Sequence, residues 1–439
     1  MKKIICLLCV ITLLFGVVLS TTSCLSLSTI LDALNSEEEP GAGLPEPDEG
    51  GEEEKNPPVG EGGENGNASE ESEEGSDFLP DRDVAQESAE ALAGPKRALL
   101  STVSIVANFS VRDSFGQPGQ SSMAGAGVVY KLDKESGDAY IITNFHVVYN
   151  VSSVNPSGIS NDIIVYLYGQ EYSDYKISAS YLGGSLEYDI AILKVEDSEV
   201  IKNSPVLEAE LGDSETVRAF DKVFVIGNPE AFGIAVTEGI VSVESEQLSM
   251  TGADGKTDVE FRVMRVSAAV NNGNSGGGLY DENGNLIGII NAKRQGSDVD
   301  NIGYAIPVNL AVALAENIIY NCDGNLKTSI KKCLLGVTIS IEATGVEINP
   351  DTEDIRIREV VYVKEMTDSS IVKGKVLVGD VITAITVDGV RHEVTRLHHV
   401  TDNMLYARVG SVVTLEITRG DSNISVTIEM TDSSVTTVL

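Results

Sequence analysis

The feature that most constrains the fold is a series of short apolar segments between Ala98 and about Pro307. Each segment is rich in Val, Ile, Phe and Tyr, and Gly, Asn or Asp residues separate it from the next. β-Branched and aromatic residues favour strands, whereas Gly, Asn and Asp favour turns. Short strands at this frequency predict a mostly β fold, either a barrel or a sandwich.

The length of the chain, 439 residues, is enough for two or three domains of the usual size. An apolar stretch from Leu310 to Ile319 predicts a helix, and a second strand-rich unit restarts at Leu334. Within that unit residues 395–407 predict another helix. One face of this helix would carry Leu397, Val400, Met404 and Leu405.

The charge of the chain is concentrated near its N-terminus. The formal net charge is −36, and residues 37–90 hold 20 acidic residues against 2 basic ones. This stretch has almost no large apolar side chains, so burial cannot offset the entropy of ordering it. We therefore expect residues 25–90 to be a disordered acidic linker, most simply a solvated tether, although a specific acidic binding function is an alternative. Acidic surface also argues against nucleic acid as a partner, because phosphate contacts need Lys and Arg.

The first 24 residues predict export. Lys2 and Lys3 precede an apolar run from Ile4 to Leu19, which is too short for a comfortable membrane span. The small residues that lead to Cys24 resemble a bacterial lipoprotein signal, in which that cysteine would be lipidated. Thr21 stands where such signals usually have Leu, so ordinary cleavage or a retained anchor remains open. The sequence thus predicts a protein anchored to the extracytoplasmic side of a membrane, in the cell envelope or periplasm or at the cell surface.

A glycine-rich loop around Ser275 is the candidate reaction centre. Its sequence is NNGNSGGGLY, and it lies between apolar runs at residues 263–270 and 286–290. Gly273 can turn the backbone so that its N–H and that of Ser275 point at one spot, as an oxyanion hole requires. The alternative is a glycine-rich hairpin with an idle serine.

A serine needs a base and a carboxylate to become a nucleophile, and the chain offers both. His146 follows an apolar strand and is the only histidine between residues 90 and 330. Asp189 opens an alternating strand, where an unpaired carboxylate would cost several kcal/mol. His146 could instead be a core histidine. The competing aspartates, which lie in turn-like contexts, are Asp162, Asp174 and Asp213.

Five segments of this sequence, and the order in which they occur, resemble the HtrA/Deg family of serine proteases. They are TNFHVV, DIAILKV, GNSGGGL, GNPEAFGIAVTEGIVS and NIGYAIPVN. The resemblance implies a chymotrypsin-like double β-barrel at residues 91–325, with His146, Asp189 and Ser275 as the catalytic triad in the cleft between two six-stranded barrels. It also implies acyl transfer without a metal or organic cofactor, and unfolded proteins as substrates.

Residues 330–432 resemble an α+β PDZ domain. The turn Leu335-Gly336-Val337 would hold the carboxylate of a C-terminal peptide that adds to a sheet edge. A small α+β core in which Gly336 is only a turn residue is the alternative.

Four further expectations follow from the family resemblance. Ile290, Asn291 and Ala292 would lie beside the pocket for the first substrate side chain and favour Val or Ala there. The stretch from Ala98 to Val106 resembles the segment through which the family forms homotrimers. Gly278, where many relatives have Pro or Ala, would loosen the backbone after the nucleophile, and Asn274 replaces the aspartate that zymogen activation needs.

The remaining histidines and cysteines predict no metal site. His398 and His399 are adjacent on the expected helix and would not share one face, so we interpret them and His392 as surface residues. Cys322 and Cys333 have ten residues between them, and export would permit a disulfide.

Two functions compete on this sequence. The first is an extracytoplasmic serine endopeptidase for misfolded or damaged proteins, regulated by the PDZ domain. The second is a catalytically inert peptide-binding chaperone or scaffold. The intact triad motifs favour the first.

Overall fold

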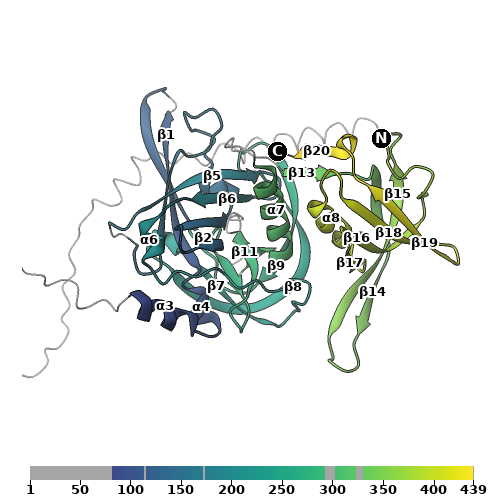
Figure 1. The fold of residues 1–439 in the computed structure, drawn as a ribbon, viewed down its shortest axis with the longest axis horizontal. Helices are drawn as coiled ribbons and strands as arrows, with labels where there is room; N and C mark the ends of the chain where they lie inside the picture. The colour runs from purple at the N-terminus through teal and green to yellow at the C-terminus, as the bar shows by residue number, and fades with distance from the viewer. Residues whose placement is uncertain (1–81, 113–114, 172–173, 292–301, 323–329, 439) are drawn as a thin grey trace, which may run out of the picture. The chain divides into compact units, whose positions relative to one another are not determined.

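The computed structural model describes residues 82–112, 115–171, 174–291, 302–322 and 330–438. The export signal with Cys24, most of the acidic linker and Ala292 lie outside the described residues. Residues 74–439 belong to one compact unit, and its elements are drawn in Figure 1. No helix in the described ranges is long and apolar enough to cross a membrane.

The first barrel closes through six antiparallel strands in the order β1-β2-β3-β6-β5-β4. β1 pairs with β4 to complete the ring. Alternate side chains such as Val103, Ile105 and Ala107 are buried in its core. The strands are β1 (Thr102–Arg112), β2 (Pro118–Asp133), β3 (Asp138–Thr143), β4 (Asp162–Leu167), β5 (Ile177–Ser185) and β6 (Ile190–Val195).

The second barrel also closes through six strands, in the order β10-β11-β12-β9-β8-β7. Its core is built from Val223, Val225, Met264, Leu279 and Ile290 among others. The double β-barrel expected from the sequence is therefore confirmed. The strands are β7 (Lys222–Gly227), β8 (Ala235–Thr251), β9 (Asp258–Val266), β10 (Gly278–Tyr280), β11 (Leu286–Asn291) and β12 (Gly303–Pro307).

Short helices fill the connections between strands. They are α4 (Pro95–Ala98), α5 (Phe145–Val148), α6 (Glu199–Lys202) and the 3₁₀ helix η1 (Pro229–Ala231). Before them, Arg82–Glu90 forms helix α3. The expectation of a disordered linker up to residue 90 was therefore wrong for these nine residues. Ala85 and Ala89 have high helix propensity, and Ala89 is buried.

The long helix α7 (Val308–Asn321) follows the second barrel. It confirms the helix expected at residues 310–319 and is longer at both ends. Leu310, Leu314 and Ile318 lie in a buried apolar cluster that also contains Leu405 from the C-terminal part of the chain. Asn317 is fully buried, and its Nδ2 donates hydrogen bonds to the carbonyl oxygens of Lys331 and Leu405, both at 2.8 Å.

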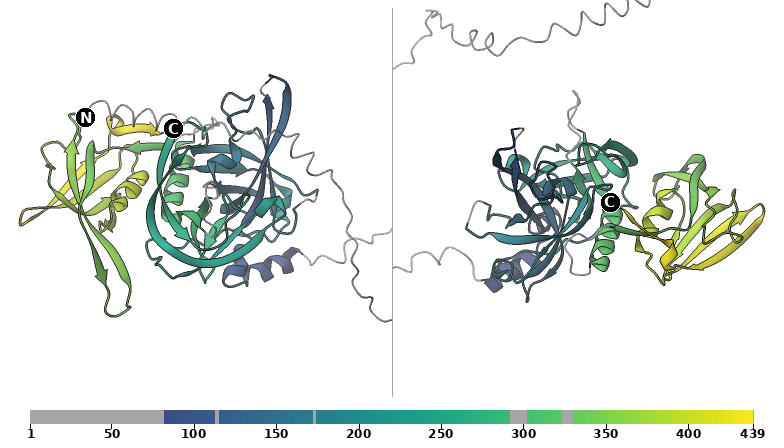
Figure 2. Two further views of the ribbon diagram at one scale, coloured as in Figure 1. Left: turned by 180° about the vertical axis from the view of Figure 1, so that it is seen from behind. Right: turned by 90° about the horizontal axis from the view of Figure 1, so that it is seen from above.

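The C-terminal part has a core of its own, which includes Val361, Ile385, Leu415 and Ile417. In its six-stranded sheet the neighbours are β14-β15-β16-β18-β19, with β17 on β16, and β13 pairs with β20. β14 and β15 form a long hairpin that projects from this sheet (Figures 1 and 2). The strands are β13 (Ile330–Cys333), β14 (Val337–Ile348), β15 (Ile355–Met366), β16 (Val381–Val387), β17 (Val390–Glu393), β18 (Val412–Arg419), β19 (Ser422–Glu429) and β20 (Val435–Val438).

The helix expected at residues 395–407 is shorter than predicted. It consists of α8 (His398–Asn403) and the 3₁₀ turn η2 (Met404–Tyr406), and the further 3₁₀ turn η3 is Asp432–Ser434. Side chains bind the backbone before α8: Thr395 N–H donates to His399 Nδ1 at 3.2 Å and Leu397 N–H donates to Glu359 Oε2 at 2.8 Å. These contacts replace the helical bonds of a further turn.

Cys322 and Cys333 are free thiols in the structure, so the disulfide that export would permit is not formed. Cys322 packs against the cluster that contains α7, whereas Cys333 is buried in the core of the C-terminal part. Each sulfur therefore lies in a different apolar environment.

Candidate active site

His146 and Asp189 meet because they lie at the ends of two paired strands. β3 leads to α5, which carries His146, and Asp189 immediately precedes β6, with Thr143 opposite Ala191 in the β3–β6 ladder. His146 Nδ1 lies 2.6 Å from Asp189 Oδ2. The backbone N–H of His146 donates to Asp189 Oδ1 at 2.9 Å. Two contacts from one residue therefore fix the carboxylate against the imidazole.

The backbone of Asp189 is held in an unusual conformation. Its φ is 52°, in the left-handed region that costs a residue with a Cβ some free energy. Its carbonyl oxygen accepts hydrogen bonds from Asn144 Nδ2 at 2.8 Å and Phe145 N–H at 3.2 Å. The side chain is almost fully buried. The competing aspartates are exposed; they are Asp162, Asp174 and Asp213.

Ser275 lies in the loop between β9 and β10 of the second barrel and is buried. Its carbonyl oxygen accepts the N–H of Ala126 from the first barrel at 2.8 Å. A Cβ placed on Gly276 would lie 2.3 Å from Thr143 Oγ1 and 3.1 Å from the backbone nitrogen of Asn144. The nucleophile loop thus packs directly against the segment that leads to His146, and only glycine fits at position 276.

Gly273 also depends on having no side chain. Its φ is 93°, and a Cβ there would lie 2.1 Å from the carbonyl oxygen of Asn228. The carbonyl oxygen of Gly273 accepts the N–H of Asn228 at 3.3 Å, and that of Asn272 accepts the N–H of Glu230 at 2.7 Å. These contacts anchor the loop to residues 228–230. The assignment of the Gly273 and Ser275 N–H groups to an oxyanion hole stays a prediction.

Asn291 contributes to the site in a way that the sequence did not suggest. Its side chain is buried, and its Nδ2 donates to Asp189 Oδ2 at 2.9 Å. The signal was present as a single amide at the end of the otherwise apolar buried strand β11. Ile290 is fully buried in the core of the second barrel. The assignment of these residues to a substrate pocket stays a prediction.

The structure explains the glycine at position 278. A Cβ on Gly278 would lie 2.3 Å from the ring of Tyr280, which is fully buried. The Tyr280 hydroxyl lies 2.9 Å from Thr102 Oγ1 in the first barrel. Tyr280 therefore fills the space that a larger residue 278 would need, so the loosening expected after the nucleophile is offset by packing.

The turn Leu335-Gly336-Val337 borders a cavity of about 220 Å³ between β14 and α8. Gly336 has a φ of 75°, and its carbonyl oxygen accepts the N–H of Thr367 at 2.9 Å. Ile339, Val400 and Met404 add apolar lining. Capture of a peptide carboxylate by this turn stays a prediction.

The histidines of α8 are not surface residues as the sequence suggested. His398 is buried, and His399 is half-buried. Their Nε2 atoms lie 3.2 and 2.9 Å from the same atom, Glu215 Oε2. The surface assignment was wrong because the carboxylate that both histidines contact comes from the loop between α6 and β7 and not from α8. His392 is exposed, as expected.

The two barrels are similar in sequence to known serine proteases. Residues 125–289, which include His146, Asp189 and Ser275, match the trypsin-like peptidase domain family. The chain is 32% identical over 255 residues to the serine protease Do-like HtrA of Bacillus subtilis, covering 57% of this chain and 51% of that protein. It is 34% identical over 214 residues to the serine protease Do-like HtrA of Lactococcus lactis subsp. lactis, covering 47% of each.

The chain thus spans about half the length of the curated relatives that it matches. Among solved structures it is similar to the HtrA-type protease AlgW with decapeptide. That comparison has a TM-score of 0.47 and 25% identity, and covers 76% of this chain and 96% of the other.

Proposed function

We propose that the chain is a member of the HtrA family of trypsin-like serine proteases and a serine endopeptidase that cleaves unfolded or damaged proteins. The observation that carries the proposal is the 2.6 Å contact between His146 Nδ1 and Asp189 Oδ2, beside the loop of Ser275. A structural histidine would not need a buried carboxylate on one ring nitrogen next to a glycine-lined serine loop.

In the proposed mechanism Ser275 Oγ attacks the carbonyl carbon of a peptide bond. His146 takes the hydroxyl proton on Nε2 and then gives it to the leaving amine. Asp189 accepts the Nδ1–H of His146, so the imidazole keeps the tautomer whose Nε2 is a base. The N–H groups of Gly273 and Ser275 stabilise the oxyanion, and each such donor contributes about 10²–10³-fold in rate. Water then hydrolyses the acyl-enzyme.

Regulation and location are further parts of the proposal. The apolar cavity beside Leu335 and Val337 supports a PDZ-type site for the C-terminus of a peptide. The export signal and Cys24 support an extracytoplasmic, membrane-anchored protein. Val103 and Ile105 face the core of their own barrel, so a homotrimer would have to use the partly exposed Leu99 and Leu100 instead. Sedimentation of the purified chain that gives only monomer would contradict a trimer.

The test of the proposed chemistry is covalent labelling of the full chain with a fluorophosphonate, followed by mass spectrometry of the peptide that contains Ser275. We expect an adduct on Ser275 that disappears in His146→Ala and persists in the exposed control His392→Ala. If no adduct forms, with or without a C-terminal peptide, while that peptide still binds, the inert chaperone or scaffold becomes the better description.

A further inference from the structure

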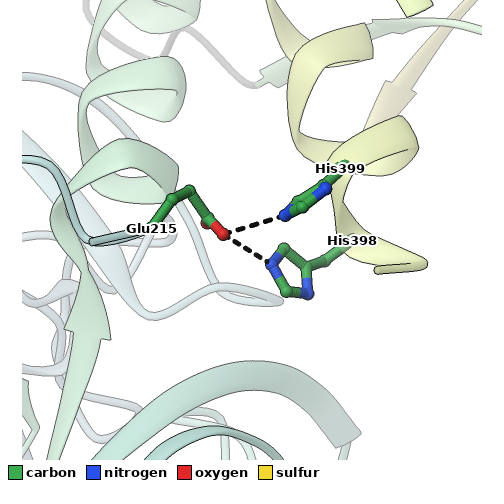
Figure 3. A group of neighbouring side chains, drawn as sticks. All are labelled: Glu215, His398 and His399. Atoms are coloured by element: carbon green, nitrogen blue, oxygen red, sulfur yellow. Dashed lines mark hydrogen bonds and ion pairs between the residues drawn. The ribbon is translucent and has the colours of Figure 1, made fainter. Parts of the chain in front are cut away.

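Glu215, His398 and His399 form a compact cluster of metal-ligand type within the unit of residues 74–439 (Figure 3). The three ligand atoms, Glu215 Oε2 and the two Nε2 atoms, all lie within 4.8 Å of one another. The two rings are 4.7 Å apart and nearly perpendicular, at 88°. Both histidines thus direct the same type of nitrogen at one carboxylate oxygen.

His399 also makes two contacts through its other ring nitrogen, Nδ1. His399 Nδ1 lies 3.0 Å from the carbonyl oxygen of Glu393, which can only accept a hydrogen bond. Its contact with the backbone N–H of Thr395 is longer, 3.2 Å. The Thr395 contact needs a lone pair on Nδ1 and the Glu393 contact needs a proton there, so each contact corresponds to a different tautomer. In the tautomer with the proton on Nδ1 the lone pair lies on Nε2, 2.9 Å from Glu215 Oε2, which is the form that can bind a metal ion.

The charged groups around the cluster do not fully neutralise its carboxylates, so a bound cation would be favourable. Arg262 is buried and contacts both Glu215 Oε1 at 3.4 Å and Asp402 Oδ2 at 2.5 Å. The single positive charge of Arg262 is thus shared between two carboxylates. With both imidazoles neutral, the cluster carries one net negative charge.

We propose that Glu215, His398 and His399 bind a divalent transition metal of the zinc type. Imidazole nitrogen suits Zn²⁺ and its neighbours, whereas Ca²⁺ and Mg²⁺ prefer oxygen ligands. Metal–ligand bonds of about 2.0–2.1 Å in a tetrahedron separate ligand atoms by ~3.3 Å. The observed separations of 3.2 and 2.9 Å from Glu215 Oε2 are close to that value, and the two imidazole nitrogens lie within 4.8 Å of each other, so binding would need the side chains to adjust.

The site has a supporting contact and a route of entry. The carbonyl oxygen of Glu393 would orient His399 by accepting its Nδ1–H, as backbone carbonyls do for metal-bound histidines. A cavity of about 210 Å³ is lined by all three ligands, so solvent can supply the metal and a water for the fourth position. Bound metal would tie α8 to the loop before β7. This inference does not rest on the proposed protease function.

The experiment is equilibrium dialysis of the metal-free full chain against Zn²⁺, with bound zinc measured by mass spectrometry. We expect about one Zn²⁺ per chain. Glu215→Gln and His399→Ala should weaken binding at least about 100-fold, because even the partners that orient metal ligands are each worth 10–100-fold. The exposed control His392→Ala should bind as the unaltered chain does.

Glu215→Gln decides the outcome if His399→Ala does not fold, because it keeps the shape of the side chain and a hydrogen-bond acceptor. Circular dichroism of the metal-free variants checks the fold. No zinc on the unaltered chain would mean that a protonated His399 alone satisfies Glu215, and would overturn the proposal. Full binding by folded Glu215→Gln would assign the metal to other groups and would overturn the proposal as well.

Discussion

The His146–Asp189 pair and the Glu215–His398–His399 cluster both place a carboxylate against imidazole nitrogen, but different parts of the chain build them. The first joins residues 43 positions apart at the ends of two adjacent strands of one barrel. The second joins residues more than 180 positions apart, from a loop and a short helix. A carboxylate–imidazole contact can therefore form within one sheet or depend on the packing of segments that are distant in the sequence.

The largest expected effect comes from matched carboxylate-to-amide changes. Asp189→Asn should lower kcat about 10⁴-fold, because an amide stabilises the wrong tautomer of His146. Glu215→Gln should change kcat less than about threefold in metal-free buffer. Peptide hydrolysis by the two purified variants measures both values. An equal loss of kcat in the two variants would mean that Glu215 also takes part in catalysis, and that the two carboxylate–imidazole groups do not differ in function.

The cluster should matter more for stability. Arg262 is buried between Glu215 and Asp402, so Arg262→Gln should lower the free energy of unfolding by about 3 kcal/mol by leaving carboxylates unpaired. The control is Arg265→Gln, since Arg265 pairs with Glu246 at a more exposed position and should cost about 0–1 kcal/mol. Urea unfolding of both variants tests this. A loss for Arg262→Gln no larger than for Arg265→Gln would contradict it.

A smaller effect would show how Asp189 is held. Asn291→Ala removes the 2.9 Å hydrogen bond to Asp189 Oδ2 but leaves both contacts from His146. A hydrogen bond to a charged group contributes about 2 kcal/mol, so kcat should fall about 30-fold with little change in KM. Steady-state kinetics separate the two constants. A rise in KM at constant kcat would assign Asn291 to the substrate pocket instead.

The smallest effect is the pH dependence of stability. Although burial opposes it, hydrogen bonds from His398 and His399 hold the pKa of Glu215 well below its usual range, and burial lowers the pKa of His398. For both groups the unfolded chain binds protons first as the pH falls. Stability is therefore full above the ordinary histidine value of about 6.5 and declines below it.

Thermal unfolding in EDTA between pH 8 and 5 measures this decline. His398→Gln cannot take up a proton, so its melting temperature should fall less over the same range. Because EDTA removes metal ions, this measurement separates protonation of the cluster from metal binding. An identical pH profile for the variant and the unaltered chain would show that His398 makes no contribution.

Much of the protease part could be predicted because its signals are local. Alternating apolar residues and turn residues identify the strands, and the glycines at 273 and 276 occupy positions where a Cβ would collide with backbone or side-chain atoms. His146 and Asp189 each lie next to such a strand. Asn291 was assigned to a substrate pocket by the family resemblance, and the direction of its side chain toward Asp189 could not be predicted from the sequence.

The mostly β fold, the helix after it and the candidate triad residues could be predicted from the residues, because strand pattern and glycine geometry depend on neighbouring residues, whereas the double barrel was implied by the family resemblance. Packing in three dimensions was needed to show that Asn291 donates to Asp189, that Cys322 and Cys333 remain thiols, and that the two histidines of α8 face Glu215. These contacts join residues from separate elements. Their geometry depends on how whole domains pack, which no local pattern in the chain encodes.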